Sequence, residues 1–312
     1  MNHPLSQGSH LFTSPTKNLT FEYLVLHPTN NHNNNNNNAS LPLNLITIQC
    51  PAWGIGSRYL QTGLYPLTTH PQTHNNILLF FHPRGTDGSS RPPHPSQMCS
   101  MPHLASDLDD LRQHLGLRAF PVLLGHSNGG AIALGYAEMY PERVQKLVLL
   151  NHQLVGMKDR GDIEVFRGDE RYAGAFWRMM ECRREEETDG EFTRSVREMW
   201  PLYFWDPGRF VDVLVRDIGE GRVMPVWCYR GLYGCDQGLS RSGQMIDGLG
   251  RVCARTLMIF GRDDLICGVK IAERSREGIQ GARLIAYDHC GHFPWIEQRE
   301  RTLNDIASFL DS

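Results

Sequence analysis

The sequence predicts an α/β fold in which a doubly wound, mostly parallel sheet carries an inserted helical cap. Apolar runs of strand length alternate with segments of helical periodicity, and one run passes through a Gly-x-Ser-x-Gly turn into a small-residue helix. This alternation stops near residue 153 and resumes after residue 250. Because alternating strands and helices favour right-handed crossovers, we expect the strands to run parallel.

The amino-terminal region, residues 1–40, is expected to be disordered and of low complexity apart from one strand. Residues 1–18 are polar and rich in Ser, Pro and His, and Asn30 to Asn38 form a run without apolar periodicity. Between these two stretches, residues 21–26 alternate in polarity and favour a strand.

Two stretches, residues 41–153 and 251–312, are predicted to build the α/β core. Their apolar runs are too short for helices and suit strands buried on both faces. The expected strands are 43–49, 77–81, 120–124, 146–150, 256–260 and 282–287, and the expected helices are 58–67, 104–115, 129–140, 269–278 and 297–310.

Residues 154–250 are charged, aromatic and helical in pattern, which indicates a cap over the carboxyl edge of the sheet, where ligands bind. Aromatic side chains in such a cap either wall an apolar substrate pocket or form the small core of the cap itself. The candidates for a pocket wall are Trp177, Trp200, Tyr203, Phe204 and Trp205, and further aromatic residues of the cap are Trp227, Tyr229 and Tyr233.

Composition excludes several classes of function. A formal charge of −3 and a pI near 6.5 argue against a nucleic-acid partner. No apolar run reaches the roughly 20 residues that span a bilayer, and no secretory signal is recognisable.

The eight cysteines lack paired spacing, so we expect reduced thiols and a cytoplasmic location. His289, Cys290 and His292 lack a second pair of ligands that would complete a metal site.

The segment Gly125-His126-Ser127-Asn128-Gly129 has the form of a nucleophile elbow, a tight turn that holds a serine hydroxyl above the sheet. Glycine suits positions where a Cβ atom would collide with the crowded turn. Ser127 is therefore the predicted nucleophile, and His126 beside it is expected to be structural.

The partners of the serine follow in the order Ser, Asp, His, which this type of site uses. Asp264 and His292 each come just after a predicted strand, so both belong to the same rim of the sheet as Ser127. His292 is assigned as general base and acid, and Asp264 as the carboxylate that orients it. Asp263 is the alternative carboxylate, and His289 is the alternative base.

The oxyanion formed during attack needs backbone donors. One is expected to be the N–H of Asn128 at the start of the following helix, where the helix dipole helps. The other is expected from the loop after residues 43–49. Pro51 has no N–H, so Ala52 is the first choice and Trp53 the second.

Taken together, these motifs resemble the lid-bearing α/β-hydrolases, and within them the prolyl-aminopeptidase-like hydrolases, which include many fungal members. The likeness covers roughly residues 43–310. Residues 50–54 are placed like that family's His-Gly-Gly-Pro-Gly loop, residues 84–89 like its Arg-Gly turn, and residues 199–207 like part of its cap. The chain departs from that family in its elbow, which usually reads Gly-Gly-Ser-Trp-Gly, and in His82, where an Asp is usual. One clear strand precedes residues 43–49, where two are usual.

The leading hypothesis is a serine hydrolase that cleaves an ester, lactone, thioester or amide of a small, largely apolar molecule. The resemblance implies a place in fungal secondary metabolism, or alternatively a proline iminopeptidase activity. A lyase or cyclase, or a receptor-like binding protein on the same fold, remains open. We expect a small-molecule substrate, no nucleic-acid or membrane partner, and neither cofactor nor metal, because the triad supplies the chemistry itself. Oligomeric state is left open.

Overall fold

A computed structural model describes residues 3–29, 44–73, 75–157, 168–181 and 188–312. In these residues eight strands form one sheet in the order β1-β2-β4-β3-β5-β6-β7-β8. From β4 to β8 all neighbours pair in parallel, whereas β1 and β2 add an antiparallel edge. The predicted α/β class with a mostly parallel sheet is therefore confirmed. The strands are β1 (Gly8–Thr13), β2 (Thr20–Leu26), β3 (Leu45–Gln49), β4 (Ile77–Phe81), β5 (Phe120–His126), β6 (Val144–Leu150), β7 (Arg255–Gly261) and β8 (Arg283–Tyr287).

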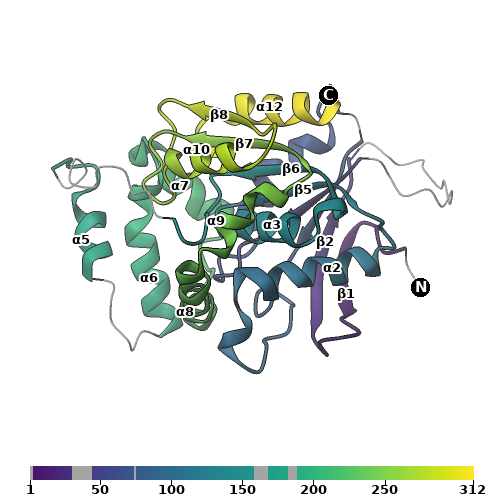
Figure 1. The fold of residues 1–312 in the computed structure, drawn as a ribbon. Helices are drawn as coiled ribbons and strands as arrows, with labels where there is room; N and C mark the ends of the chain where they lie inside the picture. The colour runs from purple at the N-terminus through teal and green to yellow at the C-terminus, as the bar shows by residue number, and fades with distance from the viewer. Residues whose placement is uncertain (1–2, 30–43, 74, 158–167, 182–187) are drawn as a thin grey trace.

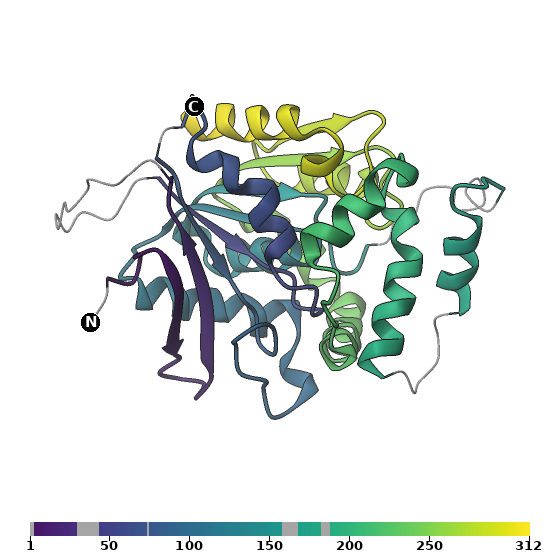
Figure 2. The same ribbon diagram turned by 180° about the vertical axis from the view of Figure 1, so that it is seen from behind.

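Helices cover both faces of this sheet (Figures 1 and 2). Alternate residues of β5 point to opposite faces, so Leu123 joins one apolar core and Leu124 the other. The first core includes side chains of α2, α3 and α10, and the second includes side chains of α1 and α12. The core helices are α1 (Arg58–Leu64), α2 (Ala105–His114), α3 (Asn128–Met139), α10 (Val269–Gly278), α11 (Pro294–Glu297) and α12 (Arg299–Asp311).

A helical insertion separates β6 from β7, and its described residues contain no strand. Local signals explain where its helices begin and end. Thr188 and Glu191 form a capping box at the start of α6, and Asp206 caps α7 ahead of Pro207. Gly243, in the left-handed conformation, ends α8. The insertion comprises α5 (Ala173–Glu181), α6 (Asp189–Met199), α7 (Pro207–Ile218), α8 (Val226–Ser242) and α9 (Gln244–Gly248).

The expectation of disorder over residues 1–18 is wrong for the described part of that segment. Residues 8–13 form β1, which pairs with β2, so two strands precede β3 rather than one. Phe12 is the buried side chain of β1, and its ring packs 5.5 Å from that of Phe21. An edge strand needs few apolar residues because its backbone hydrogen bonds come from the neighbouring strand. The asparagine run at 30–38 lies outside the described residues.

The expectation that all cysteines are reduced is also wrong, because a disulfide joins Cys99 to Cys235. These residues are 136 positions apart, so only the fold brings them together. The bond ties the loop before α2 to α8 of the insertion. The prediction of a cytoplasmic location consequently loses the support that it drew from cysteine usage. Among the described helices, none has the length and apolar character to cross a bilayer.

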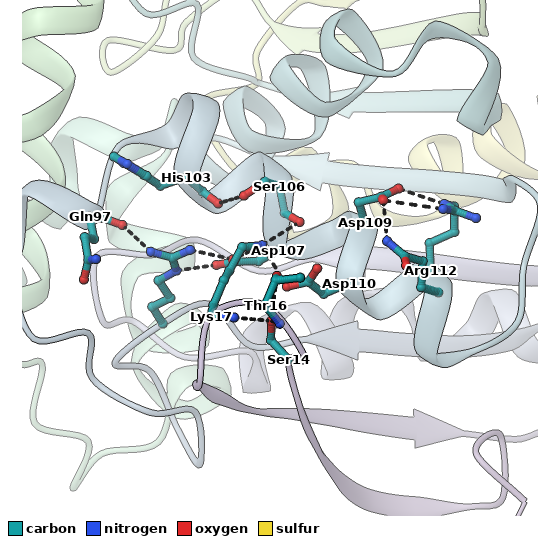
Figure 3. Close-up of polar contacts among 12 residues, drawn as sticks. Ser14, Thr16, Lys17, Gln97, His103, Ser106, Asp107, Asp109, Asp110 and Arg112 are labelled. Carbon is teal, nitrogen blue, oxygen red and sulfur yellow. Dashed lines mark hydrogen bonds and ion pairs between the residues drawn. The ribbon is translucent and has the colours of Figure 1, made fainter.

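A buried ion-pair network anchors the loop after β4 (Figure 3). Arg84 makes two charge-assisted hydrogen bonds to Asp107 of α2, at 2.6 and 2.7 Å, and both side chains are buried. Lys17 reaches Asp107 at 3.1 Å and Asp110 at 2.7 Å, which ties in the hairpin of β1 and β2. This network fixes the start of the loop that leads to Cys99 and Ser100, next to the candidate site.

Candidate active site

Ser127 occupies the sharp turn between β5 and α3. Its φ of 54° and ψ of −123° are strained for a residue with a side chain, as a nucleophile elbow requires. A Cβ atom on Gly125 would lie 2.4 Å from the carbonyl oxygen of Gly129, and one on Gly129 would lie 2.3 Å from that of Gln49. Glycine is therefore obligatory on both sides of Ser127, because backbone cannot yield as a flexible side chain could.

His292 and Asp264 meet at the carboxyl edge of the sheet, in the loops that follow β8 and β7. The Nδ1 atom of His292 lies 2.9 Å from Oδ2 of Asp264, and both residues are buried. Asn151, which follows β6, donates to the same oxygen at 2.7 Å. Burial alone would raise the pKa of Asp264, but the charge and hydrogen bond of His292 and the bond from Asn151 hold this pKa below its usual value. The carboxylate is therefore charged and fixes the ring of His292.

The alternative residues occupy different positions. Asp263 accepts a hydrogen bond from the backbone of Cys290 at 3.2 Å and so braces the loop before His292. The exposed ring of His289 packs against Trp205, with centroids 4.6 Å apart. Of the two carboxylates considered, Asp264 is the one that contacts His292.

His126 links the loop of His292 to Tyr59 of α1. Its Nε2 atom donates to the carbonyl oxygen of His292 at 3.0 Å, so its Nδ1 atom is left to accept from the hydroxyl of Tyr59 at 3.1 Å. Burial, together with the charge of His292, holds the pKa of His126 well below its usual value. A neutral ring with both nitrogens in use has a structural role.

The two predicted oxyanion donors are placed differently. Asn128 is the first residue of α3, where a backbone N–H has no partner within the helix. The backbone N–H of Ala52 instead donates to the side-chain oxygen Oδ1 of Asn128 at 2.9 Å. The loop that holds Ala52 therefore lies beside the elbow as expected, but this donor is engaged.

A chain of hydrogen bonds joins this loop to the insertion. Asn128 Nδ2 donates to the hydroxyl of Ser100 at 3.1 Å. The hydroxyl and backbone N–H of Ser100 donate to Asp236 of α8 at 2.7 and 2.8 Å. The disulfide between Cys99 and Cys235 runs directly alongside, since each cysteine precedes one partner of the Ser100–Asp236 pair. Hydrogen bonds and a disulfide thus link α8 of the insertion to the elbow.

The aromatic residues proposed for a pocket wall have different surroundings. The ring of Tyr203 lies 5.3 Å from that of His292, and the carbonyl oxygen of Tyr203 accepts from the His292 N–H at 2.7 Å. Trp200 and Phe204 are fully buried in the apolar core. Trp177 is 51% exposed. Trp205 packs on His289. Apart from Tyr203, the proposed residues therefore belong to the packing or the surface of the insertion.

Other tyrosines, which the sequence analysis named only as aromatic residues of the cap, lie near Tyr203. The rings of Tyr229 and Tyr233 are 4.4 Å apart, and the hydroxyl of Tyr233 lies 3.4 Å from Nε2 of Gln153. The backbone N–H of Gln153 donates to the carbonyl oxygen of Ser127 at 3.0 Å. Burial raises the pKa of Tyr203, and the neighbouring Tyr233 and Tyr229 raise it further. The phenol group of Tyr203, beside His292, is therefore neutral.

Cys267 is the site residue that sequence reasoning missed. Its thiol lies close enough to Ser127 to interact with that side chain, and its sulfur, a carboxylate oxygen of Asp264 and a ring nitrogen of His292 all lie within 4.8 Å of one another. Burial, and then the charge of Asp264, raise the pKa of this thiol well above its usual value. The available signal was its position three residues after Asp264 in the same loop.

A separate cavity of about 520 Å³ lies next to the loop after β3 and does not include Ser127. Its wall includes several charged and polar side chains. His82 lies between Glu22 and Ser57, at 2.9 and 2.8 Å, and Arg222 pairs with Asp87 at 2.6 Å. The partners of these charged groups lie within the wall itself, and no part of the triad borders the space.

Comparison with known proteins agrees with this geometry. Residues 70–173 match the family model described as the alpha/beta hydrolase fold. A solved hydrolase from Pseudomonas aeruginosa PA01 superposes with a TM-score of 0.70 at 20% identity, covering 97% of this chain and 98% of that one. The protein is therefore an α/β-hydrolase-fold protein.

Curated relatives match this chain over part of its length. A 2-hydroxy-6-oxononadienedioate/2-hydroxy-6-oxononatrienedioate hydrolase of Paraburkholderia xenovorans (strain LB400) is 26% identical over 60% of this chain. The match covers 61% of that relative's length. A proline iminopeptidase of Lactobacillus acidophilus is 22% identical over 75% of this chain and 80% of its own.

Proposed function

We propose that this protein is a serine hydrolase that attacks the carbonyl group of a small molecule through Ser127, His292 and Asp264. The observation that carries the proposal is the contact between His292 and a charged, buried Asp264 on the rim that also holds the strained Ser127. Strain at a single residue with a side chain persists only where the surroundings enforce it, and it is concentrated at functional sites. The class of the relatives named above supports the same conclusion.

The proposed reaction begins when the hydroxyl of Ser127 donates a hydrogen bond to Nε2 of His292. His292 accepts the proton as Ser127 attacks, and Asp264 stabilises the resulting imidazolium. The N–H of Asn128 and a donor from the loop at Ala52 bind the oxyanion, each worth about 3–4 kcal/mol in the transition state. His292 then returns the proton to the leaving group, and water releases the acyl group in a second round.

The substrate class that we propose is an ester, lactone, thioester or amide of a small, largely apolar molecule, with secondary metabolites as the first compounds to screen. The phenol groups of Tyr203 and Tyr233 lie near the site and can both donate and accept hydrogen bonds, so we expect a polar group beside the reacting carbonyl to be accommodated there.

A second candidate is hydrolysis of a carbon–carbon bond next to a carbonyl group, because the Paraburkholderia relative is named as a hydrolase of an oxo-substituted dienedioate, which offers such a bond. The same attack on a carbonyl starts both reactions, but here the leaving group is a carbon atom that must be protonated. A third candidate is release of an amino-terminal proline, which the match to the iminopeptidase supports. Parallel assays of an aryl ester, a vinylogous 1,5-diketone and a prolyl arylamide separate the three, and only the peptidase requires a free amine.

The decisive test is labelling with a fluorophosphonate probe, followed by intact mass measurement. Wild-type protein should gain one adduct, and the Ser127→Ala variant should gain none and lose turnover on the order of 10⁶-fold. A folded wild-type protein that gains no adduct, or a Ser127→Ala variant that loses less than about tenfold in rate, would overturn the assignment of the nucleophile.

A further inference from the structure

The candidate active site contains a thiol that its proposed chemistry does not use. Attack by a serine requires a hydroxyl, an imidazole and a carboxylate. Cys267 adds a sulfur atom within 4.8 Å of both Asp264 and His292, and all three residues are at least 97% buried. A sulfur, a nitrogen and an oxygen that converge in this way form the ligand set that binds zinc in proteins.

We infer that Cys267, His292 and Asp264 form a binding site for one thiophilic divalent cation, with Zn²⁺ as the natural choice. Three protein ligands leave a fourth tetrahedral position for water or for the hydroxyl of Ser127. Binding exchanges the proton of the Cys267 thiol for the metal and releases that proton to solvent, so the site gains one positive charge overall.

The surroundings hold the three ligands in place. Asp264 accepts hydrogen bonds from Asn151 at 2.7 Å and from the backbone N–H of Ile266 at 2.8 Å. These contacts, together with the 2.9 Å contact between Asp264 and His292, hold the carboxylate and the imidazole ring in place before a metal arrives.

The functional consequence rests on the proposed serine hydrolase. A metal held by Cys267 and His292 withdraws the imidazole from proton transfer and lies against the hydroxyl of Ser127. Zinc is therefore an inhibitor of this enzyme rather than its cofactor, and removing the metal restores activity.

The cysteines elsewhere in the described residues do not compete for this role. One further cluster of metal-binding type is Cys99, His103 and Cys235, whose two sulfur atoms are joined in the disulfide. Cys253 is an exposed free thiol and serves as the matched control. Because reductant would release the sulfur atoms of Cys99 and Cys235, the experiments must use a buffer without reductant, with the disulfide verified by intact mass.

The first experiment measures binding without reference to activity. Co²⁺ titrated into wild-type protein should produce a near-ultraviolet sulfur-to-cobalt charge-transfer band that saturates at one equivalent and disappears when Zn²⁺ is added. The band should persist in the Ser127→Ala and Cys253→Ser variants and vanish in Cys267→Ala. Loss of a direct ligand should weaken cobalt binding by more than the roughly 10–100-fold cost of changing a residue that only orients a ligand. Cys267→Ser is measured beside Cys267→Ala, and circular dichroism verifies that both variants are folded. Loss of the band can then be separated from misfolding of the alanine variant.

The second experiment measures inhibition. Zn²⁺ should suppress turnover by wild type and by Cys253→Ser, and EDTA should restore it; the rate of Cys267→Ala, taken relative to its own metal-free rate, should resist zinc. The inference is overturned if folded wild type shows no saturable cobalt band, or if Cys267→Ala retains it. A band without any hydrolase activity would instead refute the proposed function and leave the metal site intact.

Discussion

The backbone N–H of Ala52 donates a hydrogen bond to the side chain of Asn128, the residue directly after the proposed nucleophile, across 2.9 Å. The acceptor is an amide carbonyl oxygen, so it occupies the place where a substrate's carbonyl oxygen would bind if Ala52 is an oxyanion donor. In the free enzyme, the side chain of Asn128 thus supplies a hydrogen-bond acceptor for the buried N–H of Ala52. Substrate must displace this oxygen before the donor becomes available.

Replacing Asn128 with aspartate tests this arrangement. Asn128→Asp keeps the shape of the side chain but places a negative charge beside the developing oxyanion. We expect kcat/KM to fall by about 10²–10³-fold, the size of the loss when an oxyanion donor is removed. Steady-state kinetics measures the effect.

Asn128→Ala is the matched control, because it frees the Ala52 N–H and adds no charge. Its loss in kcat/KM should be clearly smaller than that of Asn128→Asp. Equal losses in the two variants would mean that the side chain acts only by packing.

The two adjacent carboxylates, Asp263 and Asp264, can be separated by paired substitutions. Asp264→Asn removes the charge that fixes His292 and should lower kcat by about 10⁴-fold. Asp263→Asn should stay within a few-fold of wild type, since Asp263 contacts the backbone of Cys290 and not His292. Measuring kcat for both variants decides the matter, and the reverse ranking would exchange the two assignments.

The disulfide between Cys99 and Cys235 should contribute measurably to stability. Closing so long a loop restricts the unfolded chain, and loss of a native disulfide typically costs about 2–5 kcal/mol. The double variant Cys99→Ser/Cys235→Ser should therefore unfold several degrees below wild type in a thermal scan. Reductant should lower the midpoint of wild type toward that of the variant and leave the variant unchanged. An unchanged midpoint after complete reduction, verified by mass, would refute this prediction.

Glu138 of α3 should make stability depend on pH. Its side chain is 2% exposed, and neither carboxyl oxygen has a hydrogen-bond partner among the described residues. Burial raises its pKa to about 8, against the opposing charge of Arg251. Between the ordinary pKa of 4.5 and about 8, the folded protein keeps a proton that the unfolded chain releases. The contribution of Glu138 to stability is therefore present below pH 4.5 and is lost as the pH rises to about 8.

The free energy of unfolding should accordingly fall by roughly 1.4 kcal/mol per pH unit across that interval from this group alone. Glu138→Gln should remove this slope, because glutamine does not ionise. Urea unfolding at a series of pH values compares the two proteins. Identical slopes would show that Glu138 titrates normally in the folded protein.

Much of the fold followed from sequence because its signals are local. The boundaries of β4 and α10 agree with the expected ranges, since an uninterrupted apolar run and a regular helical period each mark their own ends. The contact between His292 and Asp264 was also predictable, because parallel strands bring their following loops to one edge of the sheet.

The features that escaped prediction depend on partners distant in sequence. β1 has one buried side chain, Phe12, and exists because β2 offers it an edge. The partner of Cys99 lies 136 residues away, with no spacing rule to reveal it. Cys267 resembles an ordinary core cysteine until the loop after β7 folds back over Ser127. The occupied donor of Ala52 arises from a side chain, Asn128, that sequence reasoning considered only for its backbone.

The covalent link between Cys99 and Cys235 holds α8 beside the loop that contacts the elbow. This helix therefore cannot move away from that loop by itself when substrate enters or product leaves. Among the described residues, α5, α6 and α7 have no such covalent link to the rest of the chain. Efforts to widen the range of substrates should therefore alter those three helices and leave α8 unchanged.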